Sequence, residues 1–238
     1  MRDRETTRRE VIRDAAAIGI ATGAYGLSFG AIGVASGLSV AQTSALSLFT
    51  FTGASQFAFV GIIGGGGTLV SAVLTALLLG TRNAFYGLRL ADLLGFRGTR
   101  RVVGAHFVID ETTAMSVTRP TQELARVGFW STAIILFTLW NVGTLIGALA
   151  GAALGDPRTF GLDAAAPAAF VALLWPQLHD RRTRWVAAAA ALVAVALVPL
   201  VPVGVPVLIA GAVAIAVGLR RTARTDKQPV PEPGKDSR

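Results

Sequence analysis

Cysteine is absent from the 238 residues, and histidine, methionine and tyrosine occur only twice each. The lack of cysteine excludes disulfides, thiol catalysis and metal centres held by thiolates. Two histidines are too few for a histidine-rich metal site. Charged residues make up only 15% of the chain and hydrophobic residues 53%, a composition that argues against a single water-soluble domain.

Long apolar runs occupy much of the chain, at residues 15–36, 68–90, 127–153 and 185–219. Each run has the roughly 20 residues that are needed to cross the hydrocarbon core of a bilayer. We therefore predict an all-α fold, a polytopic integral membrane helical bundle with broken or re-entrant segments. Residues 1–14 are a basic cytoplasmic segment, 15–219 the transmembrane transporter domain, and 220–238 a polar, proline-rich tail that we expect to be disordered in the cytoplasm.

The first apolar run follows a helix-capping signal, and we interpret it as a retained helix and not as a cleaved signal peptide. Thr7 and Glu10 have the spacing of a capping box, which predicts a helix that starts before the membrane. The apolar part is long and is followed by further membrane segments, so we expect this helix to be retained.

Glycines recur at spacings of three and four residues in two of the apolar runs. One row comprises Gly19, Gly23, Gly26, Gly30, Gly33 and Gly37, and a second comprises Gly143, Gly147, Gly151 and Gly155. At about 100° per residue, each row lies along one side of a helix. Such smooth faces allow close helix contact within lipid, either in a rigid bundle or between parts that move during transport.

Basic residues indicate the topology. Twenty of the 22 Lys and Arg residues lie in five short segments: 1–14, 89–101, 119–126, 181–184 and 220–238. If all five segments are cytoplasmic, an even number of crossings separates residue 14 from residue 89. Three apolar segments lie between these residues, so one of the three should not cross. Both termini are then cytoplasmic, and residues 155–163 form an external loop.

The segment that does not cross is predicted to be residues 41–63. Eight polar side chains interrupt it, and Gly53 can break its helix. Irregular backbone at membrane depth has to be buried in protein or line an aqueous cavity, so this segment should contribute to a site. The alternative is an ordinary span whose hydroxyl groups bond to their own helix. Gly53, Ser55 and Gln56 are the candidate substrate-binding residues at the break, where a helix N-terminus favours a carboxylate.

Two further regions carry charge at membrane depth. Arg82 lies well inside an apolar run, where a charged group normally faces a polar interior and could bind a substrate carboxylate. The alternative is that Arg82 pairs structurally with Asp110 or Glu111, or extends to the interface. These two carboxyl groups lie in residues 102–118, a short segment that we expect to dip into the membrane, and they are candidates for ion or proton coupling. His106 shares a helix face with Asp110, but two ligands do not make a metal site.

Several stretches carry a family resemblance in order and spacing. They are "YGLSFGAIGVASGLS" near the start, "FTGASQF", "TRNAFYGLRL", "IDET" and "GLDAAAPAAFVALLWPQLHDR". Together they resemble the AzlC family, inner-membrane proteins associated with branched-chain amino acid export. Arg82, Tyr86 and Gly87 match the family pattern in "TRNAFYGLRL", whereas Gly80 and Asn83 stand where that pattern has Asn and His.

The resemblance implies export of branched-chain or other small neutral amino acids together with a small membrane subunit of the AzlD type. Asn83 and Tyr86 then join Arg82 as substrate-binding candidates, and the glycine rows could form the subunit surface. We expect a protein of the cytoplasmic membrane with no enzymatic activity, cofactor, metal or nucleic-acid partner. Two other functions remain open: an intramembrane enzyme that uses His106, Asp110 and Glu111, and a scaffold that transports nothing.

Overall fold

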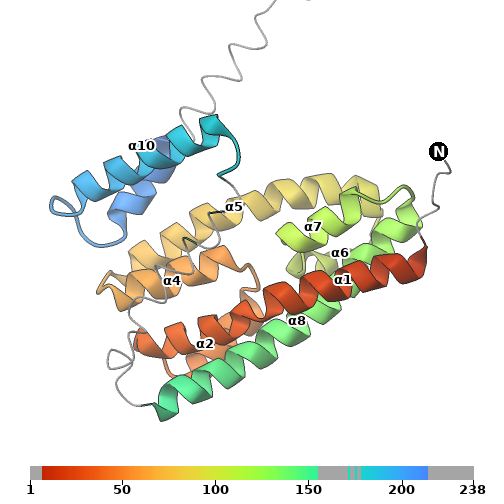
Figure 1. Ribbon diagram of the computed structural model, residues 1–238, viewed down its shortest axis with the longest axis horizontal. Coiled ribbons are helices and arrows are strands. Elements are labelled where there is room, and N and C mark those ends of the chain that lie inside the picture. Colours follow the sequence, from red (N-terminus) through yellow and green to blue (C-terminus); the bar gives the residue numbers. More distant parts are fainter. Residues whose placement is uncertain (1–6, 155–170, 172–174, 176–177, 214–238) are drawn as a thin grey trace, which may run out of the picture.

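The computed structural model describes residues 7–154, 171, 175 and 178–213, and these residues form helices joined by short connections (Figure 1). The helices are α1 (Arg8–Gly23), α2 (Tyr25–Ala35), α3 (Val40–Phe49), α4 (Ala54–Gly64), α5 (Leu69–Leu94), α6 (Thr99–His106), α7 (Asp110–Val117), α8 (Gln122–Ala153) and α10 (Arg181–Leu197). A further helix begins in residues 205–213. The predicted all-α class is confirmed for the described part of the chain.

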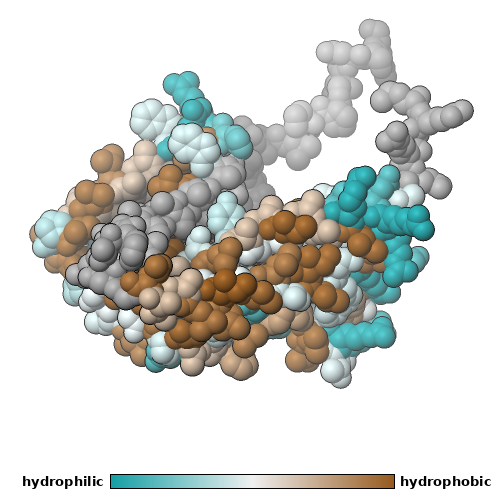
Figure 2. Space-filling view, turned by 60° about the horizontal axis from the view of Figure 1, so that its bottom comes forward, coloured by the Kyte–Doolittle hydropathy of each residue, from teal (hydrophilic) through white to brown (hydrophobic). Residues whose placement is uncertain are grey.

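Three helical segments are long and apolar enough to cross a membrane. They are Arg8–Ala35, which joins α1 and α2 almost without interruption, α5, and α8. The first begins as predicted, because Thr7 and Glu10 form both hydrogen bonds of a capping box. Apolar side chains cover most of the face seen in Figure 2, and hydrophilic residues gather at one end. That distribution suits a protein whose sides contact lipid.

The two glycine rows lie against each other, because α1 and α2 pack along α8. A Cβ atom added at Gly30 would overlap the carbonyl oxygen of Thr144, and one added at Gly147 would overlap the carbonyl oxygen of Leu27. Only glycine allows the backbones to approach this closely. These faces are therefore covered within the chain and are not free to bind a subunit. Gly33 instead packs against Thr43 of α3, and Gly37 lies in a turn after α2 with φ of +90°. Gly155 lies outside the described residues.

Residues 41–63 are broken, as predicted. α3 ends at Phe49, four residues form a turn, and α4 begins after Gly53, whose φ of +66° suits glycine. α4 runs back to the end where α5 begins, so the two short helices form a re-entrant hairpin (Figure 1). α6 and α7 form a second hairpin, which enters from the end where α5 finishes and contains the predicted dip at residues 102–118.

Three of the basic segments meet at one end of the molecule. Arg119 forms an ion pair with Asp14 at 3.3 Å, and Arg126 Nε donates to the Leu94 carbonyl oxygen at 2.7 Å. Residues 14 and 89 are thus separated by two long helices and one re-entrant hairpin, in agreement with the even number of crossings. We call this end, with residues 7–14, 94–99 and 119–126, the arginine-rich end.

Within the described residues, the last apolar run forms a helical hairpin. α10 is followed by a turn and by the helix that begins in residues 205–213. The turn contacts the start of α5, where Ser71 Oγ donates to the Val203 carbonyl oxygen at 3.1 Å. The predicted external loop at 155–163 and the predicted disordered tail at 220–238 lie outside the described residues, as does most of 164–178.

Candidate functional site

A cavity of about 630 Å³ lies where the two hairpins meet α5 and α8. Its charged wall comes from α5 and from the first turn of α7, with Arg82, Asp110 and Glu111. Its apolar wall includes Phe57 of α4 and Trp140 of α8. The cavity, which we call the charged cavity, therefore places groups of both charge signs opposite aromatic surface.

Arg82 and Asp110 form an ion pair across the charged cavity. The Arg82 guanidinium lies 2.8 Å from an Asp110 carboxylate oxygen, and the two side chains are 39% and 41% exposed. Partial exposure means that a small ligand can reach both groups. Asp110 and Glu111 occupy the first turn of α7, where the positive end of the helix dipole stabilises carboxylates.

The predicted site residues divide between two cavities. The charged cavity is lined by Gly53, Arg82, Tyr86, Asp110 and Glu111. A second cavity of about 720 Å³, which we call the apolar cavity, is lined by Ser55 and Asn83 together with mostly apolar residues of α3, α4 and α5. Arg82 and Asn83 line different cavities because the side chains of adjacent residues in a helix point about 100° apart.

Gln56 lines neither cavity and instead supports the break between α3 and α4. Its side chain is 1% exposed and has both ends occupied. Gln56 Nε2 donates to the Leu46 carbonyl oxygen at 2.9 Å, and Gln56 Oε1 accepts from the Gly53 backbone N–H at 3.1 Å. The amide thus supplies an acceptor for the Gly53 N–H at the break, and it adds a hydrogen bond to the Leu46 carbonyl oxygen, which also accepts from the Thr50 N–H at 3.1 Å.

We expect Gln56→Met to destabilise the protein. Methionine has a similar length but leaves the part-buried Gly53 N–H without its side-chain acceptor and removes one hydrogen bond to the Leu46 carbonyl oxygen, at a cost of about 2 kcal/mol. The thermal unfolding midpoint in detergent should fall clearly below that of the parent. Gln42→Met is the matched control, because Gln42 Oε1 accepts from Ser39 N–H in the same way at an exposed site where water can substitute. Equal midpoints for the two variants would contradict the role of Gln56.

His106 is separated from the two carboxyl groups with which it was considered. It lines the apolar cavity, where its ring packs against Phe51, Phe107 and Phe137 with centroid separations of 5.1–6.4 Å. Asp110 faces the charged cavity. Among the described residues, no group of three His, Cys, Asp or Glu side chains could hold a metal ion.

Trp140 is a site residue that was not among the candidates predicted from the sequence. It is 3% exposed, stacks on Phe29 at a centroid separation of 5.9 Å and meets Phe57 edge to face at 6.1 Å. This aromatic group closes one side of the charged cavity. A signal was present, because Trp140 precedes Gly143 by three residues and shares its helix face.

Comparisons with known proteins agree with this architecture. Residues 17–154 match the model of a family described as AzlC protein. An uncharacterized membrane protein of Helicobacter pylori is 27% identical over 177 residues, which cover 72% of this chain and 77% of the relative. One of Archaeoglobus fulgidus is 31% identical over 159 residues, covering 66% and 69%. No solved structure matches the chain. The matched residues contain most of the first long helical segment, the whole of α5 and α8, and both hairpins, and the chain belongs to the AzlC family of membrane proteins.

Proposed function

We propose that this protein is a secondary transporter that exports branched-chain or other small neutral amino acids across the cytoplasmic membrane. The observation that carries the proposal is the charged cavity, where one cation and two carboxylates lie opposite aromatic and aliphatic side chains. A neutral amino acid has the complementary groups: a carboxylate, an ammonium group and an apolar side chain. We propose a carrier and no enzymatic activity.

Arg82 and Asp110 are the proposed partners of the substrate's two charges. The planar guanidinium of Arg82 suits the carboxylate, and the carboxylate of Asp110 suits the ammonium group. Because these two side chains pair with each other in the structure, a zwitterion that enters between them replaces one ion pair by two. Glu111, next to Asp110, is the proposed group for proton or ion coupling, and Tyr86 supplies a hydroxyl nearby.

The proposed partner is a small membrane subunit of the AzlD type. The glycine rows are covered by the chain itself, so another face has to bind it. Gly80, Ala84 and Gly87 lie on one side of α5, and a Cβ atom added at Gly80 or Gly87 would meet nothing within 4 Å. Small residues at this spacing favour close approach of a second helix, which supports α5 as the docking helix.

An efflux assay tests the function. We expect cells that express this chain with the small subunit to export preloaded leucine and valine, and cells with an empty vector not to. Leucine analogues that lack either the carboxylate or the ammonium group should not be exported, because each loses one charged contact. Absence of export of every neutral amino acid, with both proteins present in the membrane, would contradict the proposal. Export without the subunit would contradict only the partnership.

A further inference from the structure

Two stretches of the chain have the same order of elements. Residues 40–94 comprise α3, α4 and α5, and residues 99–153 comprise α6, α7 and α8. Each stretch runs as a short helix, a break, a second short helix and one long helix. The first hairpin enters from the end opposite the arginine-rich end and the second from the arginine-rich end, so the stretches point in opposite directions (Figure 1).

The breaks of the two hairpins have the same pattern of hydrogen bonds. Gly53 precedes α4, and its backbone N–H donates to the side chain of Gln56 at 3.1 Å. Ile109 precedes α7, and its backbone N–H donates to the side chain of Thr112 at 3.1 Å. In both cases the acceptor is the third residue of the returning helix. The backbone angles of Gly53 and Ile109 differ, so the match lies in the position of the cap.

The long helices also begin alike. Thr68 precedes α5 and its hydroxyl accepts from the Ser71 N–H at 3.1 Å, whereas Thr121 precedes α8 and its hydroxyl accepts from the Leu124 N–H at 3.3 Å. Caps of these kinds also begin α1 and α3, so the shared order of elements is what indicates one structural unit that occurs twice, and the caps agree with it. Units of opposite orientation are the architecture of many carriers, which bind substrate where the units meet.

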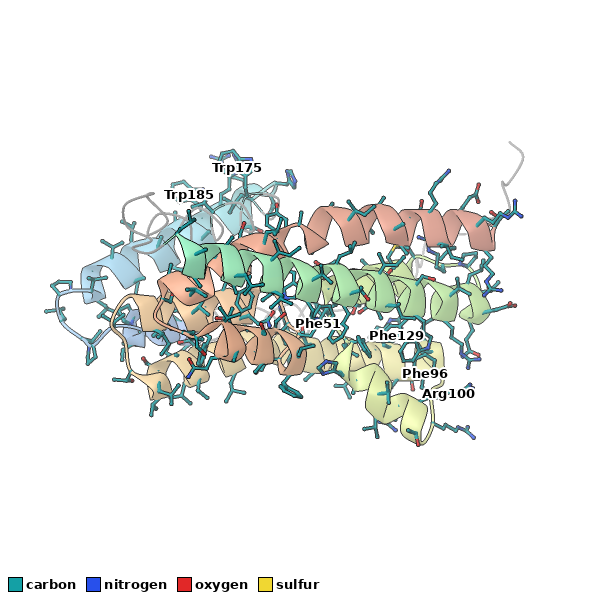
Figure 3. The ribbon with its side chains drawn as sticks, turned by 90° about the horizontal axis from the view of Figure 1, so that it is seen from below. Phe51, Phe96, Arg100, Phe129, Trp175 and Trp185 are labelled. Atoms are coloured by element: carbon teal, nitrogen blue, oxygen red, sulfur yellow. The ribbon has the colours of Figure 1, made fainter. Side chains whose placement is uncertain are left out.

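The tips of the two hairpins touch near the middle of the molecule. Phe51 and Phe107 each lie two residues before the capping residue of the returning helix. Their rings meet edge to face with a centroid separation of 6.3 Å, and Phe137 of α8 packs on both. Phe51 is 3% exposed and lies midway along the long axis (Figure 3).

The two cavities adjoin at the tip of the first hairpin, and Phe107 lines neither of them. Phe51 and Thr52 line both of them. On α5, the apolar cavity is lined mainly by residues of the first half, such as Val73 and Ala76, and the charged cavity by Arg82 and Tyr86. Because a helix rises 1.5 Å per residue, the charged cavity lies nearer the arginine-rich end.

We propose that the apolar cavity is the second access route to the charged cavity, and that Phe51, which lines both cavities and is held in place by Phe107, forms the barrier between the two routes. The inference rests on the proposed carrier function, since a carrier needs one route to each side of the membrane. The two units exchange conformations during transport, so that the barrier tips open one route and then the other.

The chain lacks cysteine, so single cysteines report access directly. Ala114→Cys reports the charged cavity and Ala76→Cys the apolar cavity. A membrane-impermeant maleimide is added to right-side-out or inside-out vesicles that contain the full-length chain. We expect Ala114→Cys to react from the arginine-rich side and Ala76→Cys from the opposite side. Rapid reaction of both cysteines from the same side would overturn the proposal.

Removing the barrier should connect the routes. With Phe51→Ala, we expect the reaction of Ala76→Cys from the arginine-rich side to become about tenfold faster, because the closed barrier is no longer favoured. Phe107→Ala should have the same effect, because Phe107 has the position in the second unit that Phe51 has in the first. This variant gives a second test if the other is poorly expressed. Phe85→Ala is the control, since Phe85 is 70% exposed and lines neither cavity.

The labelling result separates the two proposals. An unchanged rate at Ala76→Cys in both phenylalanine variants, with normal labelling of Ala114→Cys from its own side, would overturn the barrier while leaving export possible. A working barrier together with no export of any neutral amino acid would instead overturn the proposed substrate.

Discussion

Arg82→Ala is expected to reduce amino acid export by about 100-fold, since a charge-assisted, bidentate contact with a carboxylate contributes about 3 kcal/mol. The residue lines the charged cavity on α5 and reaches the start of α7 through its ion pair with Asp110. Insertion and binding of the small subunit should persist, because Arg82 lies on the side of α5 opposite to the proposed docking face of Gly80, Ala84 and Gly87. Export is measured as release of preloaded leucine, and insertion as the amount of protein in washed membranes.

Two further variants separate substrate binding from charge balance. Arg82→Lys keeps the charge but loses the planar pair of donors, so we expect partial export. In the double variant Arg82→Ala with Asp110→Asn, neither charge remains. If Arg82 only neutralises Asp110, the double variant will recover export, and this result would remove Arg82 from the binding site. Arg89→Ala, about two turns further along α5 and outside both cavities, is the control.

Gly147→Val is expected to have the largest effect on stability. The added Cβ would overlap the carbonyl oxygen of Leu27, a backbone atom that cannot move unless α2 and α8 separate. Overpacking of this kind costs about 3 kcal/mol, and here it also removes the close contact along both glycine rows. We expect little monodisperse protein in detergent and a strongly lowered thermal midpoint.

Gly87→Ala is the matched control for that substitution. Gly87 lies on α5, also within a long apolar helix, but its added Cβ meets nothing within 4 Å. The isolated chain should therefore keep the thermal midpoint of the parent, or gain slightly because alanine is the better helix former. A Gly147→Val protein with the parent's midpoint would show that the close approach of α2 and α8 does not hold the bundle together.

The topology could be predicted because its signals are either local sequence patterns or counts of charged segments along the chain. Polar side chains and Gly53 mark the break in residues 41–63, and the parity of the basic segments requires that one apolar segment turns back. Both rules need only the order of residues along the chain. The direction of each hairpin then follows from the helix that precedes it.

The composition of each cavity could not be predicted in the same way. Gln56 and Ser55 are neighbours in "GASQF", yet Gln56 bonds to the backbone at the break and Ser55 lines the apolar cavity. One residue step turns a helical side chain by about 100°, so the surroundings of each side chain depend on the neighbouring helices. The place of Trp140 in the wall of the charged cavity depends on the neighbouring helices in the same way.

The sequence alone determined that this is a membrane protein of several helices, where its long helices lie, which segments break, and which faces are smooth, since these properties depend on hydropathy, glycine spacing and charge counted along the chain. Only the tertiary structure decided that the glycine rows pack against each other, that Arg82 meets Asp110, and that the two hairpin tips touch between two cavities. Those contacts join residues far apart in the chain, and their partners are chosen by the mutual fit of whole helices.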